Sequence, residues 1–204
     1  GGPMQESTRL KELQDKALLS LSEWKELVGF EPKLIRSAPQ YVKDCLDYYG
    51  IEYETRYGRR HTILKALQLS DKMDECLIGH GLIQARLYEI LTTLCRDNSK
   101  MILLVGPNGS AKSTLWNALS YALEAYSKTS DGARYQIEWV FPHDEDEGKR
   151  VGFSKALDPL DQEFTFAFMD DEKLDKIIDD SGCSPAWLYE KDARKKYFPD
   201  TPQK

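Results

Sequence analysis

The stretch Met101-Ile-Leu-Leu-Val-Gly-Pro-Asn-Gly-Ser-Ala-Lys-Ser-Thr114 decides the fold that this sequence predicts. It opens with the apolar run 101–105, which is typical of a short strand buried in a parallel sheet. A glycine-bearing loop follows, and from about residue 112 to 126 the apolar residues recur at helical spacing. A strand, a glycine-bearing loop and a helix in this order are the context of a phosphate-binding P-loop.

The loop follows the pattern G-x-x-x-x-G-K-[ST] except that Ala111 replaces the second glycine. Backbone N–H groups of such a loop point inward and bind anions, and the following helix adds partial positive charge. We expect Lys112 to reach the β- and γ-phosphates of ATP and the Ser113 hydroxyl to ligate Mg²⁺. The candidate phosphate-binding residues are Gly106, Pro107, Asn108, Gly109, Ser110, Ala111, Lys112, Ser113 and Thr114.

The alternation of strand and helix patterns around this loop predicts an α/β protein of the P-loop NTPase type, with a parallel sheet flanked by helices. A helix is expected over 82–95, and further strands over 135–141 and 164–169. The last predicted helix covers 171–179 and turns Leu174, Ile177 and Ile178 inward.

The first part of the chain predicts helices. The apolar spacing from Leu10 to Val28 indicates one amphipathic helix over 7–28 that ends at Gly29. Ser37 and Pro39 then open a second helix, which Gly50 ends.

Residues 51–70 predict a loop or short strands. They contain the basic run Gly58-Arg-Arg-His61, which is either a solvated turn or a contact for phosphate or a protein partner.

Two further stretches carry candidate nucleotide contacts. Ile78 and Gly79 form an apolar turn before a helix, and a similar turn contacts adenine in ATPases of the AAA+ class; the alternative is a simple helix-entry turn. Asp170 follows the apolar strand 164–169 and is a weak candidate for a Mg²⁺-holding catalytic acid. The alternative is that the acidic residues 170–172 belong to a helix N-terminus.

Composition excludes several classes of protein. The chain has 204 residues, 41% of them hydrophobic and 30% charged, as in globular rather than disordered proteins. It has no apolar run near the roughly 20 residues that span a membrane, and no segment with the pattern of a secretory signal. The net charge of −6 argues against a nucleic-acid partner. We therefore expect a cytoplasmic protein.

Several stretches together resemble the PrkA-type serine protein kinases, over roughly residues 33–155. The segment Leu34-Ile-Arg-Ser-Ala-Pro-Gln-Tyr-Val-Lys-Asp-Cys-Leu-Asp-Tyr-Tyr-Gly50 is similar to the segment before their ATPase core. The loop 106–113 looks like their P-loop, in which alanine before the lysine is an accepted variant. The later stretches that match are Ala122-Leu-Glu-Ala-Tyr-Ser127, Asp131-Gly-Ala-Arg-Tyr135 and Trp139-Val-Phe-Pro142.

The resemblance implies the N-terminal part of a bacterial AAA+ ATPase that is identified as a serine protein kinase. Family members are longer, and their Walker B acid and arginine-bearing regions follow later in the chain. The implied function is binding of Mg-ATP, with little hydrolysis by this part alone. Self-association is possible in the full-length protein, and a protein substrate or partner is possible.

The expected organisation has four parts. Residues 1–3 precede Met4 and are typical of a remnant of expression. Residues 4–75 form a helical N-terminal subdomain, 76–190 an incomplete AAA+-like P-loop domain, and 191–204 a surface tail.

Two alternative functions remain. The first is a partner-binding or regulatory module switched by nucleotide, because the amphipathic first helix and its Trp24 could dock on a partner. The second is a P-loop small-molecule kinase. Residues 144–180 disfavour that alternative, because their 13 acidic and five basic residues suit a second phosphate poorly.

Overall fold

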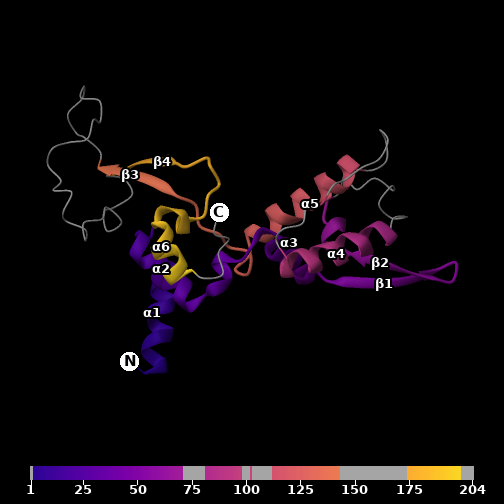
Figure 1. Ribbon diagram of the computed structural model, residues 1–204, viewed down its shortest axis with the longest axis horizontal. Coiled ribbons are helices and arrows are strands. Elements are labelled where there is room, and N and C mark those ends of the chain that lie inside the picture. The colour runs from indigo at the N-terminus through magenta and orange to yellow at the C-terminus, as the bar shows by residue number, and fades with distance from the viewer. Residues whose placement is uncertain (1, 71–80, 98–101, 103–111, 143–173, 199–204) are drawn as a thin grey trace. The chain divides into compact units, whose positions relative to one another are not determined.

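The structure is a computed structural model that describes residues 2–70, 81–97, 102, 112–142 and 174–198 (Figure 1). These residues form six α-helices and two antiparallel two-stranded sheets, so the protein is a mixed helix-and-sheet protein. Contacts divide the chain into two units. Residues 1–35 and 135–199 make up most of unit 1, and residues 36–134 most of unit 2. Each unit therefore joins residues from both sides of the predicted boundary at 75.

Unit 1 begins with two helices, α1 (Pro3–Asp15) and α2 (Leu21–Phe30), so the single helix predicted over 7–28 is wrong. The break comes from Ser20, whose hydroxyl accepts a hydrogen bond from the Glu23 backbone N–H at 3.2 Å. The Glu23 carboxylate accepts in return from the Ser20 N–H at 2.9 Å. This capping box starts a new helix at residue 21.

The predicted stop at Gly29 is also wrong, because Gly29 lies inside α2. The helix ends one residue later, at Phe30, and its C-cap Glu31 precedes Pro32. A proline disfavours helical backbone at the residue before it, so the proline rather than the glycine places this end. A 3-10 helix, η1 (Pro32–Ile35), follows.

The sheet of unit 1 pairs β3 (Glu138–Pro142) with β4 (Leu174–Ile178) in antiparallel register, with Trp139 opposite Ile177. The predicted strand over 135–141 is thus observed with later bounds. The helix predicted over 171–179 is wrong: its described part is a strand, and Ile177 and Ile178 are exposed rather than inward. Pairing with β3 stabilises the extended conformation of this segment. The β-branched side chains of Ile177 and Ile178 also favour a strand over a helix.

The end of the described chain packs into unit 1. A 3-10 helix, η6 (Pro185–Leu188), precedes α6 (Lys191–Tyr197), and Phe198 is buried directly after it. The rings of Phe198 and Trp24 lie 5.5 Å apart, and together with Val28 and Ala186 they form a small core. Residues 191–197 of the predicted surface tail form a helix without a buried residue, and the buried ring of Phe198 anchors its end.

Unit 2 contains the three helices that the sequence predicted best. They are α3 (Ala38–Tyr49), α4 (Gly81–Arg96) and α5 (Lys112–Ser127). Ser37 caps α3 by accepting from the Gln40 N–H at 3.4 Å, and Gly50 is its C-cap. Helices α3 and α5 contact the 3-10 helix η2 (Lys65–Gln68). The core consists of Tyr41, Cys45, Leu46, Leu64, Ala66, Leu67, Leu87, Leu91, Leu115, Ala118, Ala122 and Tyr126.

The segment predicted as a loop or short strands is a hairpin of β1 (Ile51–Arg56) and β2 (Arg59–Leu64). Arg56 pairs with Arg59, so the turn is the two residues Tyr57 and Gly58, with φ of 50° and 72°. Two positive φ angles in a two-residue loop define a type I′ turn.

The predicted parallel sheet is not what the described strands form, since both of their pairs are antiparallel. The predicted strands 101–105 and 164–169 lie outside the described residues, except for Ile102, which packs against the core of unit 2. In the described chain α5 lies against α3 and η2. Among the described helices, none combines the length and apolar character that crossing a membrane requires.

Arg36 joins three segments of unit 2. Its side chain is only 9% exposed, and its Nε lies 3.0 Å from a carboxylate oxygen of Asp44 on α3. Its Nη2 donates to the hydroxyl of Tyr126 on α5 at 3.0 Å and to the carbonyl of Asp131 at 3.1 Å. The guanidinium also lies 4.8 Å from the ring centroid of Tyr41, within the range of a cation–π contact.

The turn after α5 completes this cluster. The Tyr41 hydroxyl donates to the Gly132 carbonyl at 2.8 Å, and a Cβ at Gly132 would lie 2.1 Å from the Tyr126 carbonyl oxygen. No side chain fits there, so a glycine is required. Burial raises the pKa of Tyr41 and of Tyr126, while the positive charges of Arg134 and Arg36, respectively, oppose the shift.

Replacing Arg36 by methionine should destabilise unit 2. The change keeps an unbranched side chain but removes the ion pair with Asp44 and the hydrogen bonds to Tyr126 and Asp131, so we expect a loss of about 2 kcal/mol. Urea unfolding measures it. Lys128→Met is the control, because Lys128 pairs with Glu124 at the surface and should lose less than about 0.5 kcal/mol. Equal stability of Arg36→Met and wild type would contradict the role given to Arg36.

Replacing Phe198 by alanine should destabilise unit 1 by about 3 kcal/mol, because it empties the space beside Trp24. The neighbouring Tyr197 is 39% exposed, so Tyr197→Ala should cost clearly less. Denaturant unfolding monitored by tryptophan fluorescence compares the two variants. If both cost the same, Phe198 is not the anchor.

Candidate functional site

The predicted phosphate site coincides with the start of α5. Lys112 is the first residue of this helix, and Ser113 and Thr114 follow in its first turn. The other candidate phosphate-binding residues, 106–111, lie outside the described residues. The helix predicted from residue 112 is confirmed, and with it the placement of the lysine and serine at a helix N-terminus.

The two faces of α5 differ in character. Leu115, Ala118 and Ala122 are buried in the core of unit 2, and Leu119 and Leu123 are half-buried against it. The sequence predicted these five residues as the inward face. Since a helix turns by about 100° per residue, Lys112, Ser113, Trp116 and Asn117 are left on the outer face.

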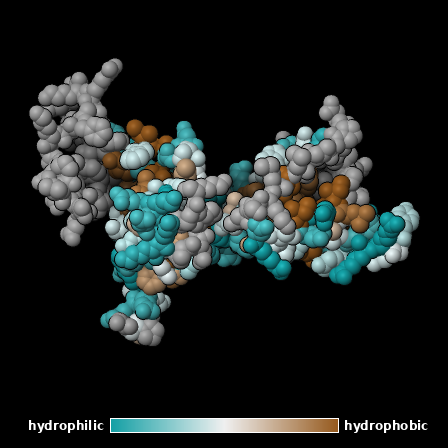
Figure 2. All heavy atoms as spheres, in the orientation of Figure 1, coloured by the Kyte–Doolittle hydropathy of each residue, from teal (hydrophilic) through white to brown (hydrophobic). Residues whose placement is uncertain are grey.

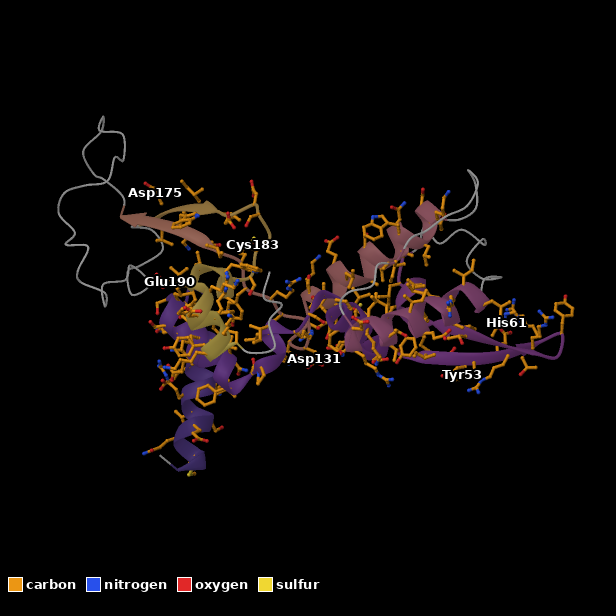
Figure 3. The ribbon with its side chains drawn as sticks, in the orientation of Figure 1. Tyr53, His61, Asp131, Asp175, Cys183 and Glu190 are labelled. Carbon is orange, nitrogen blue, oxygen red and sulfur yellow. The ribbon has the colours of Figure 1, made fainter. Side chains whose placement is uncertain are left out.

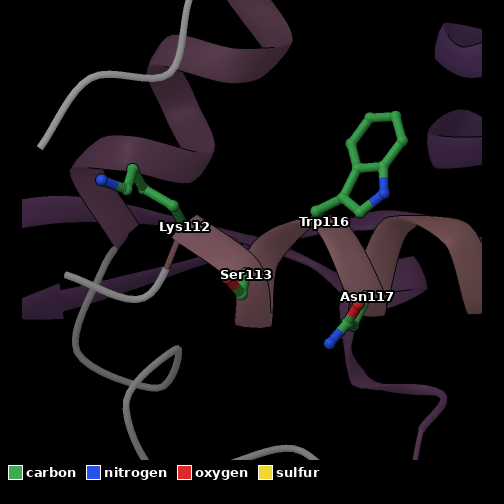
Figure 4. Close-up of a pocket in the computed structure, with 4 residues that line it drawn as sticks. All are labelled: Lys112, Ser113, Trp116 and Asn117. Atoms are coloured by element: carbon green, nitrogen blue, oxygen red, sulfur yellow. The ribbon is translucent and has the colours of Figure 1, made fainter. Parts of the chain in front are cut away.

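These four outer residues line an open pocket of about 360 Å³ (Figure 4). Lys112 and Trp116 project to one side of the helix, and Ser113 and Asn117 to the other (Figure 4). Trp116 and Asn117 lie one helical turn after Lys112 and Ser113, so all four residues border the same open pocket.

The chemistry of the pocket suits an anion. Each of the four lining side chains can donate a hydrogen bond, through the ammonium, hydroxyl, indole N–H or amide NH₂ group. None of the four is acidic, and the partial positive charge of the helix N-terminus adds to the charge of Lys112. The four described side chains therefore offer hydrogen-bond donors and one positive charge to a ligand.

Trp116 and Asn117 were missed by the sequence reasoning, which stopped at Thr114. The signal was available, because the two residues lie four positions after Lys112 and Ser113 and opposite the predicted apolar face. Trp116 is 62% exposed, which is unusual for so large an apolar side chain on a helix that packs into a core.

The remaining predicted site residues are not brought to this pocket by the described structure. Ile78, Gly79 and Asp170 lie outside the described residues. The helix that follows the predicted adenine turn, α4, begins at Gly81, where a Cβ would lie 2.5 Å from the Cβ of His61. This close approach of hairpin and helix requires a glycine at the start of α4.

A magnesium ion is the metal that the motif implies. Within the described ranges, no group of three or more His, Cys, Asp or Glu side chains could hold a metal ion. The exposed hydroxyl of Ser113 supplies one hard oxygen ligand, which fits a Mg²⁺ ion held mainly by phosphate oxygens and water.

A relative of known function would provide independent support for a phosphate site at the start of α5. Comparisons of the chain with protein-family models, curated proteins and solved structures found no match. The assignment of the site therefore depends on the loop motif and on the geometry of α5.

Proposed function

We propose that this chain binds Mg-ATP through the loop 106–111 and the first turn of α5. The observation that carries the proposal is that Lys112 and Ser113 begin a helix and line a pocket whose four described side chains are all hydrogen-bond donors. In this assignment the Lys112 ammonium stabilises charge on the β- and γ-phosphates, and Ser113 contributes a ligand to Mg²⁺.

The anchoring of α5 supports the proposal. Leu115 and Ala118 hold the first two turns against the core, and Tyr126 ties the last turn to Arg36. The Lys112 and Ser113 side chains therefore project from a helix that is fixed along its length. A site held in place before its ligand arrives loses less conformational entropy on binding.

The proposal extends to the fold and the family. In it, the segments 101–105 and 164–169 are strands of a parallel P-loop sheet, and Ile78 and Gly79 contact adenine. The chain is then the ATP-binding part of an AAA+ protein that resembles the PrkA-type serine protein kinases. This part of the proposal rests on the resemblance of the stretches within 33–155 quoted above.

Thermal unfolding with and without Mg-ATP tests the binding site. A ligand present at about 100 times its Kd stabilises the folded state by about 2.7 kcal/mol, which gives a clear rise in Tm. Lys112→Ala should abolish the rise at the same ATP concentration. The control is Lys128→Ala, which removes an exposed lysine directly after the C-terminal end of α5 and should keep the full shift. The proposal fails if wild type shows no shift, or if Lys112→Ala shifts as wild type does.

ATP hydrolysis by this chain should be slow or absent. The resemblance places the Walker B acid later in the family's sequence, and Asp170 is the weak candidate within this one. Phosphate release measured with Mg-ATP should therefore be near background in wild type and unchanged in Asp170→Asn. Fast turnover that Asp170→Asn abolishes would instead identify Asp170 as the metal-holding acid.

A further inference from the structure

Two of the exposed aromatic rings have a cation of this chain over one face. The Arg194 guanidinium lies 4.3 Å from the ring centroid of Trp187, which is 41% exposed. On the β1–β2 hairpin, the Arg60 guanidinium lies 3.7 Å from the ring centroid of Tyr53, which Figure 3 labels. Cation–π contacts of this kind stabilise a ring that remains in water. The exposure of these two rings therefore has an explanation within the chain.

Trp116 is exposed in different surroundings. No aromatic ring or cation in the described part of the chain lies over its indole, which is 62% exposed. Trp139, by contrast, lies opposite Ile177 on a sheet over which hydrophobic residues gather (Figure 2). The Trp116 ring extends away from α5 (Figure 4), and the other residues that line its pocket are polar: Lys112, Ser113 and Asn117. Packing within the described residues therefore does not account for a tryptophan here.

The position of Trp116 relative to Lys112 suits the length of a nucleotide. The two residues are four apart on α5, which is a rise of about 6 Å, and their side chains lie on the same side of the helix (Figure 4). In a nucleoside triphosphate, the α-phosphate and the ribose separate the β-phosphate from the base. These two groups can span one helical turn, so a base can reach the indole while Lys112 holds the phosphates.

The face of an indole suits a base better than a phosphate. The face of an aromatic ring carries partial negative charge, which repels an anion. A base stacks on such a ring through its own flat face, and removing the ring typically costs about 1–3 kcal/mol of binding free energy. Stacking also needs no particular hydrogen-bonding edge, so a single exposed ring is sufficient for it.

We propose that the indole face of Trp116 stacks on the base of the bound nucleotide and makes the site select a nucleoside triphosphate over inorganic polyphosphate. The proposal rests on the proposed function, because Lys112 and Ser113 must hold the phosphates. A base has two faces, so this contact is compatible with the one assigned to Ile78 and Gly79. Trp116 is thus a specificity-determining residue and takes no part in phosphoryl transfer.

Two ligands that share a triphosphate test the contact. Isothermal titration calorimetry compares Mg-ATP with Mg-tripolyphosphate, which lacks the nucleoside. Trp116→Leu removes the ring but keeps an apolar residue with a high helix propensity. It should weaken ATP binding by about tenfold or more, and tripolyphosphate binding by less than about threefold. Lys112→Ala should weaken the binding of both ligands, because it acts on the phosphates.

Two more variants show that the effect belongs to the ring of Trp116. Tyr121→Leu removes another exposed aromatic ring of α5, outside the four residues that line the pocket, and should bind both ligands as wild type does. Trp116→Phe keeps a flat ring and should retain most of the affinity for ATP. Circular dichroism verifies that each variant is folded.

Nuclear magnetic resonance gives a readout at the residue itself. The chain has four indole N–H groups, and the resonance that disappears in Trp116→Phe belongs to Trp116. ATP should shift this resonance through the ring current of the base, and tripolyphosphate should shift it much less.

The results distinguish failure of this proposal from failure of the proposed function. If both ligands bind wild type and depend on Lys112, but Trp116→Leu weakens both equally or neither, the phosphate site stands and the stacking proposal is wrong. An indole resonance of Trp116 that responds equally to both ligands would also overturn it. If neither ligand binds wild type, the proposed function is wrong and the stacking proposal falls with it.

Discussion

The buried guanidinium of Arg36 is the interaction on which unit 2 depends. A cation removed from water is tolerated only when charge and hydrogen-bond partners surround it, and here they come from α3, from α5 and from the turn after α5. Tyr126 is 90 residues away from Arg36 in the sequence, so burying this one group fixes the last turn of α5. The stretches 34–50 and 131–135, which carry part of the resemblance to PrkA-type proteins, meet at this cluster. The role of both stretches at this cluster is structural.

Helix caps and apolar spacing, which can be seen within a few residues, predicted the helices of unit 2. They did not predict the segments whose conformation depends on contacts with residues far away in the sequence. Ser37, Gly50 and the spacing of Leu115, Ala118 and Ala122 are visible within one or two turns of helix, so α3 and α5 follow from the sequence. The break at Ser20 was also local, because Ser20 and Glu23 form a capping box, but the continuous apolar spacing hid it. The strand β4 depends on pairing with Trp139, 38 residues before Ile177, and apolar residues at 174, 177 and 178 fit a helix equally well. Likewise, no local pattern shows that Phe198 reaches Trp24.

The sequence predicted only those residues of the candidate site that belong to the loop motif. Lys112 and Ser113 follow from the loop pattern, whereas Trp116 and Asn117 border the pocket only because the helix brings them one turn after Lys112 and Ser113. In the hairpin, by contrast, the usual sequence motif is incomplete. A type I′ turn is normally recognisable from asparagine and glycine, and Tyr57 removes half of that signal, so the strand pair stayed ambiguous until the register was known. Sequence rules thus fail at Trp116, whose large side chain is exposed, and at Tyr57, whose φ is positive.

The exposure of Trp116 also has an optical consequence. The chain has four tryptophans, and Trp24, Trp139 and Trp187 belong to unit 1, which leaves Trp116 as the single indole of unit 2. Trp24 is 4% exposed and its emission should lie toward the blue, whereas the indole of Trp116 is largely hydrated and should emit toward the red. Unit 1 also contains the exposed Trp139 and Trp187, so only the shielded indole of Trp24 is distinct among the four. A blue component of the emission and its loss on heating should therefore report the melting of the small core around Trp24.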